Sequence, residues 1–188
     1  MQAAEKLFTS RRLHEITLDE VAQAAKVGKG TIYRYFQDKD DLFFETATSG
    51  FGEMCELLVN KVPQDEPFAA QLQAACTQIS QFFDRRRQLF QMMQNEENRM
   101  NWLRGDLQGR WMTRRKALVE ALAAMLRKGV AEGHIRPDVP AEVLANLLLG
   151  MLRTRSRDLA DAGAPFREIA TIVELFRNGA AYRAGGPA

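Results

Sequence analysis

The chain has 188 residues, 46% of them hydrophobic and 27% charged, a composition that is typical of globular proteins and argues against a disordered or fibrous chain. Its 26 Lys and Arg residues nearly balance 24 Asp and Glu residues, so the net charge of +2 by itself indicates neither a nucleic-acid nor a membrane partner. No apolar run approaches the roughly 20 residues of a membrane span, and the first residues lack the features of a signal peptide. We therefore expect a soluble, cytoplasmic protein without a membrane partner.

Three short helices are predicted at the start of the chain. Apolar side chains recur at threes and fours from residue 3, and this first helix is expected to end near Arg12. Residues 17–20 (Thr-Leu-Asp-Glu) form a capping box, in which the Thr hydroxyl accepts from the third helical N–H and the Glu reaches back. The second helix is expected to stop at residues 26–28, and a third runs on to Phe36.

Longer helices are predicted after these three, separated by Pro and Gly residues that form turns. The expected helices cover about residues 38–60, 68–85, 98–132, 140–162 and 166–182, with a brief helical piece over 89–93. No run of alternating apolar residues indicates a strand. The sequence therefore predicts an all-α fold.

A basic window covers residues 21–37, where three Lys and Arg residues stand without any acidic residue and three hydroxyl-bearing residues can donate to phosphate oxygens. These six residues are Lys26, Lys29, Thr31, Tyr33, Arg34 and Tyr35. A short helix that begins with small or polar residues can enter the major groove of DNA, which is about 12 Å wide. A basic cluster of this size, taken alone, is more typical of a solvated helix face.

The amino-acid sequence of three segments decides between these two interpretations of the basic window. Residues 17–22 read Thr-Leu-Asp-Glu-Val-Ala, residues 27–36 read Val-Gly-Lys-Gly-Thr-Ile-Tyr-Arg-Tyr-Phe, and residues 38–42 read Asp-Lys-Asp-Asp-Leu. Over about residues 3–48 the chain resembles the DNA-binding domain of the TetR family of bacterial transcriptional regulators. The resemblance implies a three-helix helix-turn-helix domain over residues 1–48, and a larger helical domain for effector binding and dimerisation over 49–188. It also implies a ligand-responsive transcriptional repressor.

The same resemblance assigns the DNA contacts. The residues it implies are Thr17, Lys29, Gly30, Thr31, Tyr33, Tyr35 and Lys39. Lys29 and Thr31 are expected to touch base edges or phosphates from the front of the recognition helix, where Gly30 keeps the surface thin. The two tyrosines match positions that contact the backbone and neighbouring bases. Lys39 matches a phosphate-binding lysine, and Thr17 is expected to bind a phosphate as well as cap its helix.

Three positions depart from the family's pattern. Arg12 and Lys26 stand where the family commonly has Gly, at sites that often need a left-handed backbone, and that conformation costs a non-Gly residue roughly 1–2 kcal/mol. Either the turns differ at these positions, or the protein is slightly less stable. Gly28 replaces the usual hydroxyl residue as cap of the recognition helix, and Gly caps nearly as well. None of these departures removes a DNA-contacting group.

Met and aromatic residues gather on the helices that follow residue 41, where they can line an adaptable apolar pocket or fill an ordinary packed core. We predict a pocket for an unknown, mostly apolar small-molecule effector. Its expected lining is Phe51, Met54, Cys55, Leu58, Phe82, Phe83, Phe90, Met93 and Trp111.

The last two predicted helices carry apolar residues around more than half of their circumference, which means that each buries two faces. A monomer offers only one such face, so we predict a homodimer with a two-fold four-helix interface. Its two recognition helices would lie about one DNA turn, roughly 34 Å, apart on a pseudo-palindromic double-stranded operator.

Catalytic chemistry is not indicated. The two histidines, His14 and His134, lie in unrelated segments, and Cys55 and Cys76 are too far apart in sequence for a metal knuckle or a redox pair. We therefore expect no catalytic residue, metal or cofactor. The alternative to a ligand-released repressor is an activator of the same fold, or a regulator that answers a protein partner; a helical enzyme is a distant third.

Overall fold

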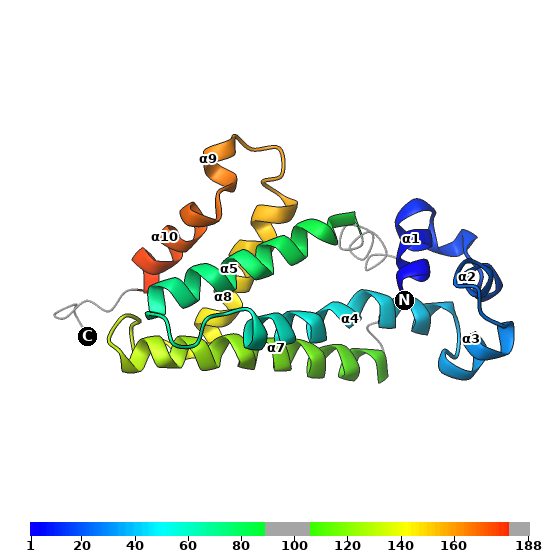
Figure 1. The fold of residues 1–188 in the computed structure, drawn as a ribbon, viewed down its shortest axis with the longest axis horizontal. Helices are drawn as coiled ribbons and strands as arrows, with labels where there is room; N and C mark the ends of the chain where they lie inside the picture. The colour runs from blue at the N-terminus through cyan, green and yellow to red at the C-terminus, as the bar shows by residue number, and fades with distance from the viewer. Residues whose placement is uncertain (89–105, 181–188) are drawn as a thin grey trace. The chain divides into compact units, whose positions relative to one another are not determined.

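The computed structural model describes residues 1–88 and 106–180 of the chain (Figure 1). These residues form helices and no strand, which confirms the predicted all-α fold. The predicted helical piece over 89–93, the beginning of the predicted helix 98–132 and the last two residues of the predicted helix 166–182 lie outside the described residues. Among the helices of the described ranges, none is long and apolar enough to cross a membrane.

The first helices begin and end close to their predicted positions. They are α1 (Gln2–Ser10), the 3-10 turn η1 (Leu13–Glu15), α2 (Leu18–Ala24), α3 (Lys29–Tyr35) and α4 (Lys39–Asn60). The capping box is present: the Glu20 N–H donates to Thr17 Oγ1 over 3.2 Å, and the Thr17 N–H donates to Glu20 Oε2 over 2.8 Å. The side chain of Asp38 caps α4, because its Oδ1 accepts from the Asp41 N–H.

The later helices are α5 (Phe68–Arg85), α7 (Asp106–Ala131), α8 (Ala141–Arg157), α9 (Ala164–Arg167) and α10 (Ile169–Ala180). Two predicted boundaries are wrong. The helix predicted to reach residue 162 ends at Arg157, because the Leu159 N–H turns back to the Thr154 carbonyl and closes the last turn. The predicted helix 166–182 is divided, since Glu168 has an extended backbone that separates α9 from α10.

The chain forms two compact units, each built from two segments. The first comprises Met1–Gly52 and Arg86–Arg114, and the second comprises Glu53–Arg85 and Arg115–Ala188. The first unit therefore extends well beyond the predicted division at residue 48. Helices α4 and α7 contribute residues to both units.

The core of the first unit lies between α1, α2, α3 and the first half of α4. Its buried residues are Ala4, Phe8, Leu13, Ile16, Leu18, Val21, Ala22, Ile32, Leu42, Phe43, Phe44 and Ala47. Phe8 packs edge-on against Phe43, with ring centroids 5.2 Å apart. Helix α3 contributes only Ile32 to this core, so its other side chains remain available at the surface.

The second unit buries an apolar stripe from each of its long helices, and α5 packs against both α8 and α10. Its buried residues include Leu72, Ile79 and Phe82 on α5, Leu122 and Leu126 on α7, Leu148 and Leu152 on α8, and Val173 and Phe176 on α10. Phe68 lies directly against Gly129 of α7, where a Cβ would come within 2.5 Å of its ring. The His134 ring stacks on Phe68, with centroids 5.7 Å apart.

Candidate nucleic-acid interface and effector site

Helix α3 presents an almost continuous polar surface. Its residues other than Ile32 are exposed. They include two large aromatic residues, Tyr33 and Tyr35, which are 56% and 65% exposed. Exposed aromatic hydroxyl side chains beside basic residues form a surface suited to phosphates and base edges. The structure thus places Lys29, Gly30, Thr31, Tyr33 and Tyr35 on one short helix, and their DNA contacts stay predictions.

The front of α3 has little bulk. Gly28 is its N-cap and supplies no side-chain hydrogen bond, and a Cβ on Gly30 would meet nothing within 4 Å. Packing inside the protein therefore does not require glycine at position 30. Its absence of a side chain leaves the backbone at the front of the helix accessible to a partner.

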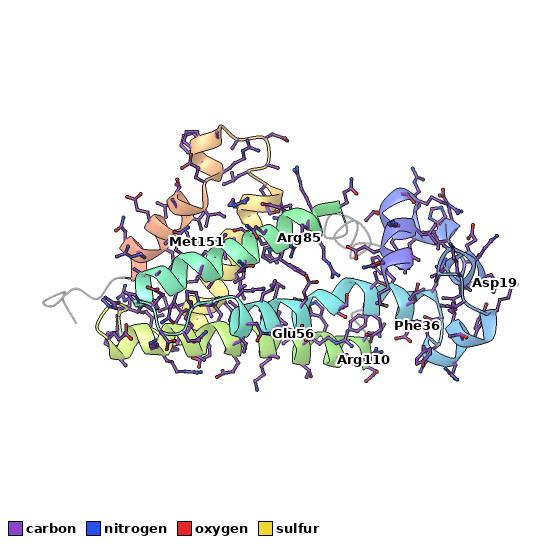
Figure 2. The ribbon with its side chains drawn as sticks, in the orientation of Figure 1. Asp19, Phe36, Glu56, Arg85, Arg110 and Met151 are labelled. Carbon is purple, nitrogen blue, oxygen red and sulfur yellow. The ribbon has the colours of Figure 1, made fainter. Side chains whose placement is uncertain are left out.

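Lys29 is paired with a residue that the sequence analysis did not assign to the site. Its Nζ lies 2.5 Å from Oδ2 of Asp19, in the first turn of α2 (Asp19 is labelled in Figure 2). This hydrogen bond, followed by the carboxylate charge, raises the pKa of Lys29 above its usual value. Both residues belong to the first unit, and the pair joins the two helices of the helix-turn-helix.

The C-terminal end of α3 is ordered by a second local contact. The Arg34 guanidinium lies 5.0 Å from the centroid of the Tyr35 ring and donates from Nη2 to the Tyr35 hydroxyl over 3.2 Å. A cation over an aromatic face restrains both side chains. Phe36, labelled in Figure 2, is half-buried and packs against the core where the chain leaves the helix.

Thr17 and Lys39 have structural partners in addition to their predicted roles. The Thr17 hydroxyl lies 3.0 Å from Glu20 Oε2, and Glu20 also accepts from Arg11. These contacts, with the Arg11 bond as the largest cause, lower the pKa of Glu20 to about 2. Lys39 Nζ lies 3.4 Å from the Leu13 carbonyl, so it links η1 to the start of α4. Their phosphate contacts stay predictions.

The turn between α2 and α3 has the left-handed residue that the sequence indicated. Lys26 has φ 56°, and the N–H groups of Lys26 and Val27 donate to the carbonyls of Gln23 and Ala22, which closes α2 with a Schellman motif. At Arg12 the turn differs from the left-handed form that the family's glycine indicates. The φ of −71° and ψ of 142° of this residue are extended, because the chain enters η1 directly from there and needs no left-handed turn.

A cluster of charged residues inside the first unit was missed by the sequence analysis. Arg110 donates to Asp41 over 3.0 Å and also bonds Glu45, while Arg114 donates to Glu45 over 2.8 Å. Both guanidinium groups lie over the fully buried Phe44 ring, 4.9 and 5.4 Å from its centroid. Desolvation, with the nearby Arg110 charge, lowers the pKa of Arg114.

This arginine cluster (Arg110 and Arg114 with Asp41 and Glu45) fixes the start of α7 to the first half of α4. Figure 2 labels Arg110 on α7. A signal was present in the sequence: two acids four residues apart on one helix match two arginines four residues apart on another. Such spacings place side chains on a common face, but many helix pairs show them, so the pattern alone did not identify the contact.

The predicted effector residues divide between the two units. Phe51 and Trp111 belong to the first, where their rings pack edge-on with centroids 6.4 Å apart. The second unit holds Met54, Cys55, Leu58, Phe82 and Phe83. Met54, Leu58, Phe82 and Phe83 are buried, and Cys55 is half-buried with its thiol pKa raised by burial. Phe90 and Met93 lie outside the described residues, and the pocket as a whole stays a prediction.

Comparison with known protein families shows to which family the chain belongs. Residues 1–46 match the family described as "Bacterial regulatory proteins, tetR family", and residues 65–157 match "Tetracyclin repressor-like, C-terminal domain". The chain belongs to the TetR family of bacterial transcriptional regulators. The family's description is one of regulatory proteins, which agrees with the class of protein that the sequence predicted.

Relatives of this TetR-family chain differ in how much of their length they share with it. The transcriptional regulator YhgD of Bacillus subtilis is 37% identical over 82 residues, which cover 44% of this chain and less than half, 43%, of YhgD. The transcriptional repressor AcnR of Corynebacterium glutamicum is 25% identical over 93% of this chain and 87% of its own. The structure of Bacillus subtilis FadR with stearoyl-CoA has a TM-score of 0.77 at 17% identity, covering 95% of this chain and 96% of FadR, and shows the same fold.

Proposed function

We propose that this TetR-family protein is a cytoplasmic, homodimeric repressor that binds a pseudo-palindromic operator and leaves it when a small, mostly apolar ligand binds. The observation that carries the proposal is the surface of α3, where basic and hydroxyl side chains are exposed around one buried anchor, Ile32. AcnR, which aligns along most of both chains, is named as a repressor, and this supports repression over activation.

DNA contacts are proposed for the residues that the sequence analysis named. Lys29, Gly30 and Thr31 form the front of α3 and would approach base edges and phosphates in the major groove. Tyr33 and Tyr35 would donate their hydroxyls to the backbone and neighbouring bases. Thr17 and Lys39 flank the helix-turn-helix and would fix its position on the phosphates.

Dimerisation is proposed through α8 and α10. On α8, Val143 is 46% exposed and Leu147 is 58% exposed; on α10, Leu175 is 58% exposed. Val143 and Leu147 lie on the face of α8 opposite its buried stripe, and Leu175 lies beside the buried stripe of α10, so both helices expose apolar side chains that the second unit does not cover. A second copy of the same two helices would cover them and form a four-helix interface with two-fold symmetry.

The effector is proposed to bind among the apolar residues of α4, α5 and α7. Met and Phe side chains supply apolar surface that adapts to ligand shape, which suits an aromatic or lipid-like molecule. FadR, which shares the fold, was crystallised with stearoyl-CoA, and this supports a lipid-like effector here. A ligand that binds more tightly when α4 is tilted differently would weaken operator binding. A difference of about 2.7 kcal/mol in its binding free energy between the two states is enough for a hundredfold loss of operator affinity.

Selection from genomic DNA tests the proposal. Sheared DNA from the source genome is passed over the immobilised full-length protein, and the retained fragments are sequenced. We expect a small set of fragments that share an inverted repeat, with half-sites about one helical turn apart. Retention of random fragments without a shared motif would reject the proposed repressor. If a motif is found, transcription of the adjacent genes with and without the protein separates the two roles, and higher transcription with the protein would favour the activator.

A further inference from the structure

The ion pair between Asp19 and Lys29 occupies the position where the protein is expected to meet DNA. Lys29 is the first residue of α3, and Asp19 lies in the first turn of α2. Their charged atoms are 2.5 Å apart, yet the side chains remain 42% and 69% exposed. An acidic side chain thus lies at a surface that phosphates would otherwise be expected to approach freely.

The environment of Asp19 makes this ion pair costlier to separate than most exposed pairs. Exposed ion pairs usually contribute little to stability. Here the second oxygen of Asp19, Oδ1, is shielded from solvent and has no hydrogen-bond partner among the described residues. Without Lys29, that carboxylate keeps a desolvated oxygen and loses its main compensating charge. A ligand that takes Lys29 from Asp19 must therefore bind the lysine more strongly than a single phosphate oxygen does.

Operator and random DNA differ in what they offer. Random DNA offers phosphates, which supply nearly all of non-specific binding. An operator also places the guanine O6 and N7 atoms, a preferred target of a lysine in the major groove, in register with the bound helix, whereas random DNA does so only by chance. We propose that Asp19 is a specificity-determining residue, because it withholds the charge of Lys29 from random DNA and releases it to the correct base. This inference rests on the proposed DNA-binding function.

Asp19→Asn tests the inference without knowledge of the operator. The full-length protein is titrated onto a fluorescently labelled duplex of random sequence at several salt concentrations, and binding is followed by anisotropy. The variant frees one cation per protomer, so we expect several-fold tighter binding and a steeper salt dependence, by about 0.9 in slope for each additional phosphate contact. Asp65→Asn, in the exposed segment between α4 and α5, makes the same change of charge outside the helix-turn-helix and should leave the slope unchanged.

A second background separates pairing from general charge. In Lys29→Gln, the additional change Asp19→Asn should no longer steepen the salt dependence, because no lysine remains to be released. Thermal unfolding of each variant shows whether the fold is kept. The inference is overturned if Asp19→Asn has the wild-type slope, or if its effect persists in full without Lys29. Wild-type protein that binds no duplex at any salt concentration would overturn the proposed function and this inference together.

Discussion

At the scale of single residues, Lys26 combines a strained backbone with a position beside the recognition helix. Its φ of 56° costs a residue with a Cβ roughly 1–2 kcal/mol, whereas Gly adopts it freely. We expect Lys26→Gly to raise the free energy of unfolding by about 0.5–1 kcal/mol, because the flexibility that Gly adds to the unfolded chain offsets part of the relief. Urea unfolding measures the change. Lys26→Ala, which keeps the strain, should show no gain, and equal stability of the two variants would contradict this account.

Two local features of the helix-turn-helix were predictable. The capping box of Thr17 and Glu20 follows from short-range geometry, the left-handed backbone of Lys26 follows from the family resemblance, and the structure contains both. The partner of Lys29 was not predictable in the same way. Asp19 is ten positions away, and only the angle between α2 and α3 brings the two side chains together.

At the scale of elements, helix α7 contains two glycines that have opposite surroundings. A Cβ on Gly129 would lie 2.5 Å from the Phe68 ring, whereas a Cβ on Gly109 would meet nothing within 4 Å. Gly129→Ala should therefore lower the free energy of unfolding by about 1–3 kcal/mol through overpacking. Gly109→Ala should raise it by up to about 1 kcal/mol through helix propensity. Chemical denaturation of both variants checks the pair, and stabilisation of the protein by both changes would show that Phe68 moves aside.

The arginine cluster makes a second prediction at this scale. Arg114→Met removes the bonds to Glu45 and Thr48 and leaves the buried Thr48 hydroxyl with one partner fewer. We expect a loss of about 1–3 kcal/mol in the free energy of unfolding. Lys116→Met, an exposed position on the same helix, should change it by less than about 0.5 kcal/mol. Thermal denaturation measures both changes. Equal effects would show that the arginine cluster does not stabilise the fold.

Helix boundaries show where sequence patterns were sufficient and where they were not. The helix over residues 68–85 was predicted at both ends, since Pro67 precedes it and a long apolar stripe defines it. The end of α8 at Arg157 and the break at Glu168 were missed, because Asp158 and Glu168 belong to residue types that also occur inside helices. Helix ends of this kind depend on tertiary packing, which the spacing of apolar residues in the sequence does not show.

At the scale of the whole molecule, assembly depends on the exposed apolar faces of α8 and α10. Leu147→Glu places a charge where a second copy is proposed to pack, and we expect it to convert the dimer to a monomer. Val59→Glu changes another exposed apolar residue, on α4, and should leave the dimer intact. Light scattering at micromolar concentration measures both. A dimer that survives Leu147→Glu, or one that Val59→Glu also disrupts, would place the interface elsewhere.

The central claim is that α3 reads DNA, and the affinity of a Lys29→Ala, Tyr33→Ala double variant for the selected operator tests it most directly. Tyr33 is 56% exposed and Lys29 is exposed, so the fold should be retained. Fluorescence anisotropy with operator and random duplexes at matched salt gives the discrimination between them. We predict that this discrimination falls by roughly 1–3 kcal/mol for each base contact that is lost. Operator binding by the double variant equal to that of the wild type would contradict the account.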